Sequence, residues 1–171
     1  MFDLVPVVDF VKQFTDIDGD HILQGYSTRT GLPREQDFCI ISNNDFERVG
    51  TNVQSWTDTA TTIRRLIRYS VLIDFIGLDR NKQAERASTV EILARSLEGG
   101  HFFKARDIGL LYADAPQYLP YIYESKEYSH RYRVQLWLEQ WNTVTLEEQT
   151  AARIDISRIV NVDTMKEEGK E

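Results

Sequence analysis

Apolar and polar side chains alternate along residues 61–77, the longest regular pattern in the chain. A period of two predicts a β-strand with one face on a core. At roughly 3.3 Å per residue the strand spans about 45–50 Å, against ~20 Å for an ordinary strand, so it either bends or projects from the domain. We expect the rest of the chain to cover its odd-numbered side chains, which are Ile63, Ile67, Tyr69, Val71, Ile73 and Phe75, with Arg65 as an exception at the outer end.

Residues 3–14 have the apolar spacing of an amphipathic helix. Asp3 is the expected N-cap, and Pro6 in the first turn costs no helical hydrogen bond. We expect this helix to stop near residues 18–19. Its apolar face would comprise Leu4, Val7, Val8, Val11 and Phe14.

Residues 79–97 predict a second helix, capped by Asp79 and ended by the glycines at 99–100. Residues 101–107 would then form a connector. The apolar stripe of this helix is expected at Ala84, Ala87, Val90, Leu93, Ala94 and Leu97. The exposed face is expected at Arg80, Lys82, Glu85, Arg86 and Arg95.

A continuous apolar run at residues 37–42 predicts a central strand. Residues 43–45 indicate a turn or bulge, and residues 46–54 continue the sheet, with Gly50 marking a bend. The polar residues 55–62 lead into the long strand. Two strands joined in this way predict an extended hairpin, an arm that projects from the domain.

The remaining strands are predicted from shorter patterns. Residues 22–23 indicate a short edge strand, and residues 108–113 a short buried strand. Residues 128–141 alternate clearly, residues 143–149 read as a polar connector, and residues 153–162 read as a last strand with a bulge. The inward face of the alternating segment would comprise Tyr132, Val134, Leu136 and Leu138.

Together these elements predict an α+β fold, in which two main helices flank a mixed, largely antiparallel sheet with long strands and an extended hairpin. We expect one domain over residues 1–163 and a charged tail over residues 164–171. A chain of 171 residues can bury enough surface to need no metal or disulfide for stability.

Composition narrows the classes of function. The net charge of −7 argues against broad, sequence-independent adhesion to nucleic acid, which requires a basic face. The single cysteine, Cys39, allows no intramolecular disulfide and favours a reducing compartment; its apolar strand predicts a core residue rather than a nucleophile. The N-terminus lacks the pattern of a signal peptide, and no apolar run approaches the length of a membrane helix.

Candidate metal ligands are few. Asp16, Asp18 and Asp20 alternate as Ca²⁺ ligands do, but His21 and Ser27 stand where such a loop needs its glycine and its bidentate glutamate. This mismatch favours a solvated helix end and turn, and no cofactor is expected. The alternative is a small metal-dependent hydrolase that uses these aspartates and one of the three histidines, His21, His101 and His130.

Arginines and aromatic residues offer a different kind of site. Arg64, Arg65 and Arg68, and the pair Arg131 and Arg133, suggest either phosphate contacts or solvated charge beside strands. Aromatic residues are dense between residues 112 and 141, and several fall in turns or on a polar strand face, so a protein interface is as good an interpretation as core packing. They are Tyr118, Tyr121, Tyr123, Tyr128, Tyr132, Trp137 and Trp141.

Three stretches in order resemble the phage neck or tail terminator family. They are LPREQDFCIISNNDFERVGTNVQSW at residues 32–56, the strand at residues 67–77, and LLYADAPQYLPYIYESKEYSHRYRVQLWLEQWNTVTLEEQ at residues 110–149. Within the first stretch the segment RVGTNV at residues 48–53 is the most distinctive. The resemblance implies a non-enzymatic virion protein of the head–tail connector region, with a mixed sheet and flanking helices.

The same resemblance implies a homohexameric ring that caps the tail tube and docks onto the head connector or stopper. Its partners would be other copies of the chain, the tail tube protein and the connector protein, with DNA passing through the lumen without specific binding and with no membrane involved. The protein would reside at the virion neck, after assembly in the host cytoplasm. Another tail-end ring protein, for tail completion or sheath attachment, remains an alternative. For the contacts we expect Arg48, Thr51, Asn52, Trp56, Arg64, Tyr118, Tyr121, Tyr123, Trp137 and Trp141.

Overall fold

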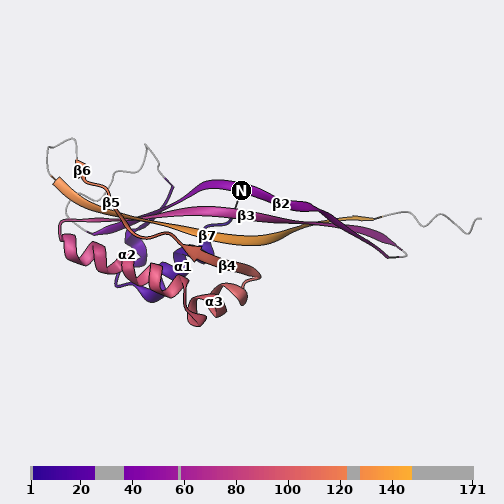
Figure 1. Ribbon diagram of the computed structural model, residues 1–171, viewed down its shortest axis with the longest axis horizontal. Helices are drawn as coiled ribbons and strands as arrows, with labels where there is room; N and C mark the ends of the chain where they lie inside the picture. Colours follow the sequence, from indigo (N-terminus) through magenta and orange to yellow (C-terminus); the bar gives the residue numbers. More distant parts are fainter. Residues whose placement is uncertain (1, 26–36, 58, 123–127, 148–171) are drawn as a thin grey trace, which may run out of the picture.

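A computed structural model describes residues 2–25, 37–57, 59–122 and 128–147. The helices lie on one face of a long, twisted sheet (Figure 1). The helical elements are α1 (Val5–Phe14), the 3-10 turn η1 (Gly19–His21), α2 (Arg80–Ala94) and α3 (Leu97–Lys104). The strands are β1 (Ile22–Gln24), β2 (Phe38–Trp56), β3 (Ala60–Gly77), β4 (Ile108–Ala113), β5 (Gln117–Tyr118), β6 (Tyr121–Ile122) and β7 (Tyr128–Glu147).

The sheet has the strand order β1-β2-β3-β7-β4. Strand β1 pairs in parallel with β2, and the other pairs are antiparallel, including those of β5 and β6 with the start of β7. The predicted α+β class, the edge strand and the largely antiparallel sheet are thereby confirmed.

Strand β3 is paired on both sides along nearly its whole length. Its partners run from Trp56 to Phe38 on β2 and from Glu147 to His130 on β7. The register of β2 shifts between Asn43 and Asp45 and again between Val49 and Val53, and Gly50 has a φ of 71° there. The predicted long strand, the bulge at residues 43–45 and the bend at Gly50 are confirmed.

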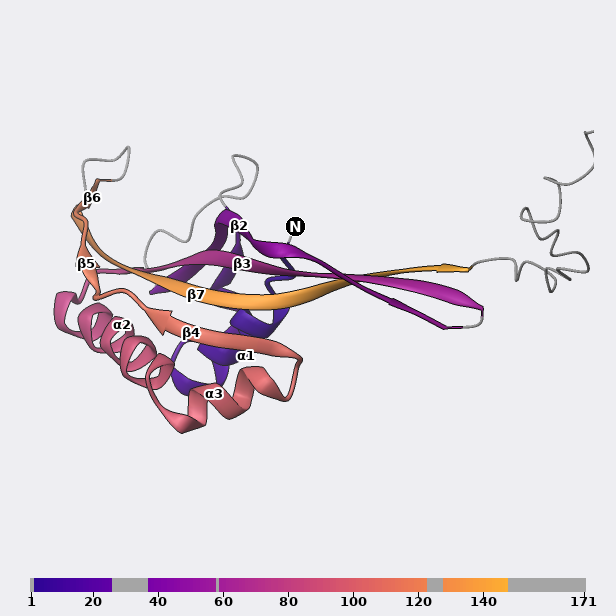
Figure 2. The same ribbon diagram turned by 45° about the vertical axis from the view of Figure 1, so that its right-hand side comes forward.

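The helices cover only the half of the sheet that forms the body of the domain (Figure 2). Phenylalanines join α1 to α3 beneath the sheet: Phe10 lies 4.9 Å from Phe103 and 5.2 Å from Phe102 between ring centroids. The strands and α2 contribute the rest of this core, including Tyr69, Val71, Ile73, Phe75, Ala87, Val90, Ala94, Val134, Leu136 and Leu138. The inward residues predicted for β7, and those predicted for β3 from Ile67 to Phe75, therefore do pack against the helices, whereas Ile63 lies beyond this core.

The opposite face of the sheet holds a smaller cluster. Phe38, Ile40 and Ile76 are buried there, with Leu23 packed against them. Beside them in the sheet Arg133 donates two hydrogen bonds of 2.8 Å to the buried carboxylate of Asp74. Because these two residues are direct partners in the register of β3 and β7, the strand pairing itself aligns the two-pronged contact.

The first helix is shorter than predicted. Its N-cap is Leu4 rather than Asp3, although the Asp3 carboxylate does accept a hydrogen bond of 3.1 Å from the Val5 amide. The helix ends at Phe14 because Thr15 adopts an extended conformation, which leads the chain toward η1 rather than onward to residue 18. The position of Pro6 in the first turn is confirmed.

The prediction of one helix over residues 79–97, ended by two glycines, is wrong. Asp79 does cap α2, but α2 ends at Ala94, and Ser96 caps α3 by accepting a hydrogen bond from the Gly99 amide at 3.2 Å. Gly99 is buried at a close approach of backbones, where a Cβ would overlap the Leu93 carbonyl. The glycine thus serves packing rather than helix termination, and most of the predicted connector at residues 101–107 is helical.

Strand β7 also exceeds its prediction. The expected polar connector from residue 143 onward continues the strand to Glu147, which is paired with Ala60. The segment alternates Thr143 and Thr145 with Val144 and Leu146, and the β-branched Thr and Val suit a pleated surface. Strands β5 and β6 were not predicted, and the strand expected at residues 153–162 and the tail at 164–171 lie outside the described residues.

Replacing Phe10 tests the packing contact between α1 and α3. Phe10 is fully buried among phenylalanines, so Phe10→Ala should lower the free energy of unfolding by about 3–5 kcal/mol in urea denaturation. The matched control is Phe46→Ala on β2, where the side chain is 61% exposed and the expected change is within about 0.5 kcal/mol. Equal losses in the two variants would contradict this description of the core.

Candidate interface

Beyond the helices, β2, β3 and β7 continue as a three-stranded ribbon. We call this ribbon the arm; it comprises residues 48–56, 60–66 and 141–147. Figure 2 shows it projecting from the body, with the turn between β2 and β3 at its end. The turn is closed by a hydrogen bond of 2.9 Å from the Thr57 amide to the Ala60 carbonyl. The predicted hairpin arm is confirmed, with β7 as its third strand.

One face of the arm is apolar at its outer end. The register places Trp56, Thr61 and Leu146 side by side in one row, and Gln54, Ile63 and Val144 in the next. The Trp56, Val144 and Leu146 side chains are 67%, 57% and 50% exposed, and Ile63 is half-buried. We call these four apolar side chains the distal patch; they lie on the same face of the sheet as the helices, which do not reach them.

A polar band separates the distal patch from the core. On this face Arg65 lies opposite Asn142, and its Nε donates a hydrogen bond of 2.6 Å to Asn52. Arg48 follows toward the body, opposite Ile67. The distal patch is therefore a second apolar surface of its own and not the fraying edge of the core.

The other face of the arm is mostly polar at the same level. Its outer rows join Ser55, Thr62 and Thr145, and then Val53, Arg64 and Thr143. An antiparallel ribbon with one apolar and one polar face normally packs its apolar face against something. The arm thus has the composition of a surface that another molecule covers.

The residues predicted for contacts are distributed over three places. Five of them lie on the arm: Arg48, Thr51, Asn52, Trp56 and Arg64. Trp141 joins them, because the Arg64 guanidinium lies 5.0 Å from the centroid of its ring. These contacts place Trp141 and Arg64 together on the polar side of the arm, facing away from the distal patch.

Trp137 and Tyr118 lie on the body. Trp137 stacks with Tyr112 at 5.9 Å and donates a hydrogen bond of 3.0 Å to Asp114. Tyr118, at the end of the body away from the arm, bonds to His130 at 2.9 Å and lies beneath Arg80. Tyr121 is in β6, and Tyr123 lies outside the described residues. The aromatic residues therefore form separate groups along β7 rather than one patch.

The arginines do not form a phosphate-binding cluster within the described residues. Arg65 bonds to Asn52, Arg68 pairs with Glu47 at 3.2 Å, and Arg133 is bound to Asp74. Each of these partners belongs to a neighbouring strand, so strand pairing spreads the arginines along the sheet.

Two exposed residues of the distal patch were missed from the sequence. Val144 and Leu146 alternate with Thr143 and Thr145, which is a strand pattern. It was missed because residues 143–149 were interpreted as a polar connector. Their phase continues that of Leu138. Extending the alternation beyond residue 141 would have found them.

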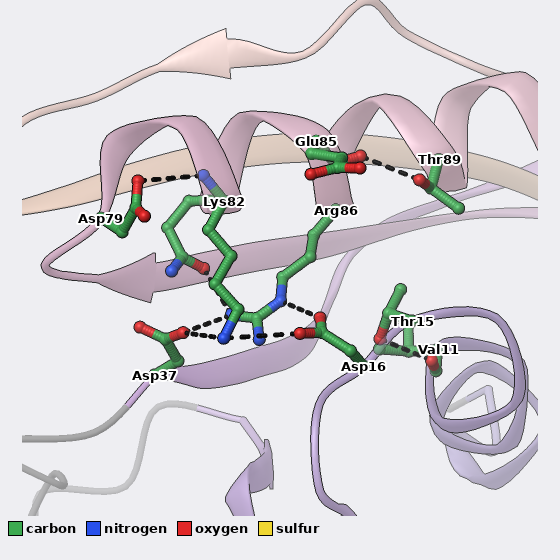
Figure 3. A network of polar contacts seen from close by, with 10 residues as sticks. Val11, Thr15, Asp16, Asp37, Asp79, Lys82, Glu85, Arg86 and Thr89 are labelled. Atoms are coloured by element: carbon green, nitrogen blue, oxygen red, sulfur yellow. Dashed lines mark hydrogen bonds and ion pairs between the residues drawn. The ribbon is translucent and has the colours of Figure 1, made fainter.

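A network of ion pairs ties the end of α1 to β2 and α2 (Figure 3). Arg86 donates to Asp16 at 2.5 Å and to Asp37 at 2.8 Å, and Lys82 lies 3.4 Å and 3.2 Å from the same two carboxylates. Arg86 was expected on the exposed face of the helix but is 5% exposed, because it follows Gln83 on the inner side of α2. The network serves to hold α1 and α2 together.

The titration of these groups follows their partners. The hydrogen bond from Arg86 holds the pKa of the Asp16 carboxyl below its ordinary value. Donation to Asp37 raises the pKa of the Lys82 ammonium. Asp16 is thereby engaged with cations instead of grouping with Asp18 and Asp20, and the described residues contain no cluster of His, Cys, Asp or Glu suited to a metal ion. Cys39 is buried, as predicted, and burial raises the pKa of its thiol.

Comparison with known proteins gives one result that covers almost the whole chain. The family model described as phage neck terminator protein matches residues 5–169. No curated protein matches the chain. Among the described residues no helix is long and apolar enough to cross a membrane.

The ion pair between Asp16 and Arg86 makes the stability of the fold depend on pH. The pKa of Asp16 is lower in the folded chain than in the unfolded chain. The contribution of Asp16 to the free energy of unfolding is therefore complete above about pH 4 and is lost as the pH falls through the pKa of the folded chain. Asp16→Asn should cost at most about 1 kcal/mol at pH 7, since Asp16 is 59% exposed, and should flatten the acid side of the stability curve.

Urea denaturation of both proteins over a pH series measures this difference. Asp20→Asn is the control, because Asp20 makes no ion pair with a described residue. If the free energy of unfolding of Asp16→Asn falls with decreasing pH as steeply as that of the unmodified protein, Asp16 is not the source of the acid dependence.

Proposed function

The chain belongs to the phage neck terminator protein family, and from this premise we propose that it acts as a homohexameric ring that caps the tail tube and joins it to the head connector. The role is structural and not catalytic. It is exercised in the neck of the virion, after assembly in the host cytoplasm. The partners are other copies of the chain, the tail tube protein and the head–neck connector or stopper protein.

The observation that carries the proposal is the amphipathic arm. A subunit that acted alone would keep Trp56, Val144 and Leu146 in water at the end of a projecting ribbon. Burying such side chains gains about 25 cal/mol per Å² of apolar surface, which favours association. A closed ring requires a head-to-tail contact between two different surfaces of the same chain, and a projecting arm reaches beyond its own body to make one.

The charge of the chain suits a passage for DNA. Six copies, each with a net charge of −7, carry −42, and carboxylates facing the lumen would repel phosphate and keep DNA mobile without specific binding. We expect an image reconstruction of the ring to place Asp and Glu side chains on the inner wall. An inner wall lined by arginines would refute this part of the proposal.

Assembly is tested by light scattering over a concentration series, with negative-stain imaging of the largest species. We expect six-fold rings from the unmodified chain. Leu146→Asp places a charge in the distal patch and should abolish them, because a charge is costly to bury without a partner.

The matched control is Thr145→Asp, one residue away on the opposite face of the arm. It should leave ring formation within about twofold of the unmodified chain, since an exposed polar site tolerates charge. Far-ultraviolet circular dichroism checks that both variants fold. A strict monomer or a stable dimer at every concentration would contradict the ring.

A further inference from the structure

In the ring proposed above, on which this inference rests, the arm of each copy must bind to a surface of its neighbour. We propose that the distal patch of one copy docks into a groove at the root of the arm of the next copy. We call this hollow the root groove; it has a volume of about 630 Å³, and its lining includes Leu66, Leu97, Gly100, Asp107, Glu139 and Trp141.

The root groove is open to solvent and is lined by both apolar and polar residues, with more apolar than polar surface. Leu97, in the first turn of α3, is 81% exposed. Gly100, one helical turn away, has open space where a side chain would stand. Apolar side chains around a hollow of this size offer room for an indole and its aliphatic neighbours. The groove therefore matches the chemistry of the distal patch.

The charges beside the two surfaces are opposite in net sign. Arg48 and Arg65 flank the distal patch on its own face, and neither pairs with a carboxylate of a described residue. The root groove is lined by two carboxylates, Asp107 and Glu139, and by one ammonium group, Lys104, and none of the three makes an ion pair with a described residue. Docking would bring the two arginines against a groove whose carboxylates outnumber its lysine, which favours the correct orientation and speeds encounter.

The occupant is a second copy and not the arm of the same copy. The arm continues the central strands of the body without interruption, so its outer end cannot fold back onto its own root. Direct packing of two distal patches against each other is also disfavoured, because that contact would place four arginines together with no carboxylate from these faces of the arms. A contact between two different surfaces remains, and it is the kind that a ring needs.

Introduced cysteines test which surfaces meet. Cys39 is buried, so Gln54→Cys and Gly100→Cys each supply one accessible thiol in an otherwise unreactive chain. Gln54 lies in the second row of the patch face, and Gly100 lies in the groove. The two variants are mixed, treated with a short bis-maleimide, and analysed on a denaturing gel beside light scattering of the same sample.

We expect a cross-linked dimer in the mixture of Gln54→Cys with Gly100→Cys, at least tenfold more abundant than with either variant alone. The matched control is Ser55→Cys mixed with Gly100→Cys, because Ser55 lies on the opposite face of the arm. It should give the background level.

Other outcomes separate this inference from the ring itself. A hexamer without the expected cross-link, or with equal cross-linking from Ser55→Cys, overturns the docking and leaves the ring intact. Cross-linking of Gln54→Cys with itself shows that the arms pair with each other, and also overturns it. A chain that remains monomeric at every concentration and gives no cross-link overturns both proposals.

Discussion

The pairing of β3 with β2 and β7 along nearly its whole length is the constraint on which the molecule depends. Side chains in a strand alternate between two faces without exception as long as the register holds. The face of β3 that packs on the helices in the body is therefore also the face that carries the distal patch in the arm. The core and the distal patch are thus two separate apolar surfaces on one face of the sheet, divided by the polar band that begins where the helices end.

All three helices pack on the sheet through one apolar core, and α1 is joined to its two neighbouring helices by two different kinds of contact. Phenylalanines of α1 and α3 are held by packing, whereas α2 is joined to the end of α1 by the ion pairs of Arg86. Buried ion pairs contribute little net stability, but breaking one leaves a charge without a partner. The pairs of Arg86 and of Asp74 with Arg133 therefore act mainly to fix which elements lie together.

Much of this fold could be predicted from the sequence because β-strand alternation is a strong signal over a long segment. It located β3, residues 128–141 of β7 and the hairpin, while apolar spacing at the helical period and the cap at Asp79 located α2. It could not predict the break between α2 and α3, since Gly99 looks like a helix terminator until its approach to the Leu93 carbonyl is seen. The burial of Arg86 depends on carboxylates from two distant segments, which no local pattern contains. For the candidate site, Trp56 of the distal patch was among the residues predicted for contacts, whereas Arg64 lies on the opposite face of the arm, and the exposure of Leu97 is a property of the packed structure.

The bulge at Asn44 has a consequence for how this surface can change. Asn43 faces the helices opposite Val71, and Asp45 faces the other way opposite Ser70, so the extra residue reverses the phase of everything that follows in β2. Without it, Trp56 and Gln54 would point to the opposite side of the arm from Leu146 and Val144. The extra two residues at the second bulge leave the phase unchanged, because two is the period of a strand. An insertion or deletion of one residue in β2 thus acts as a switch between faces, while a change of two residues only lengthens or shortens the loop.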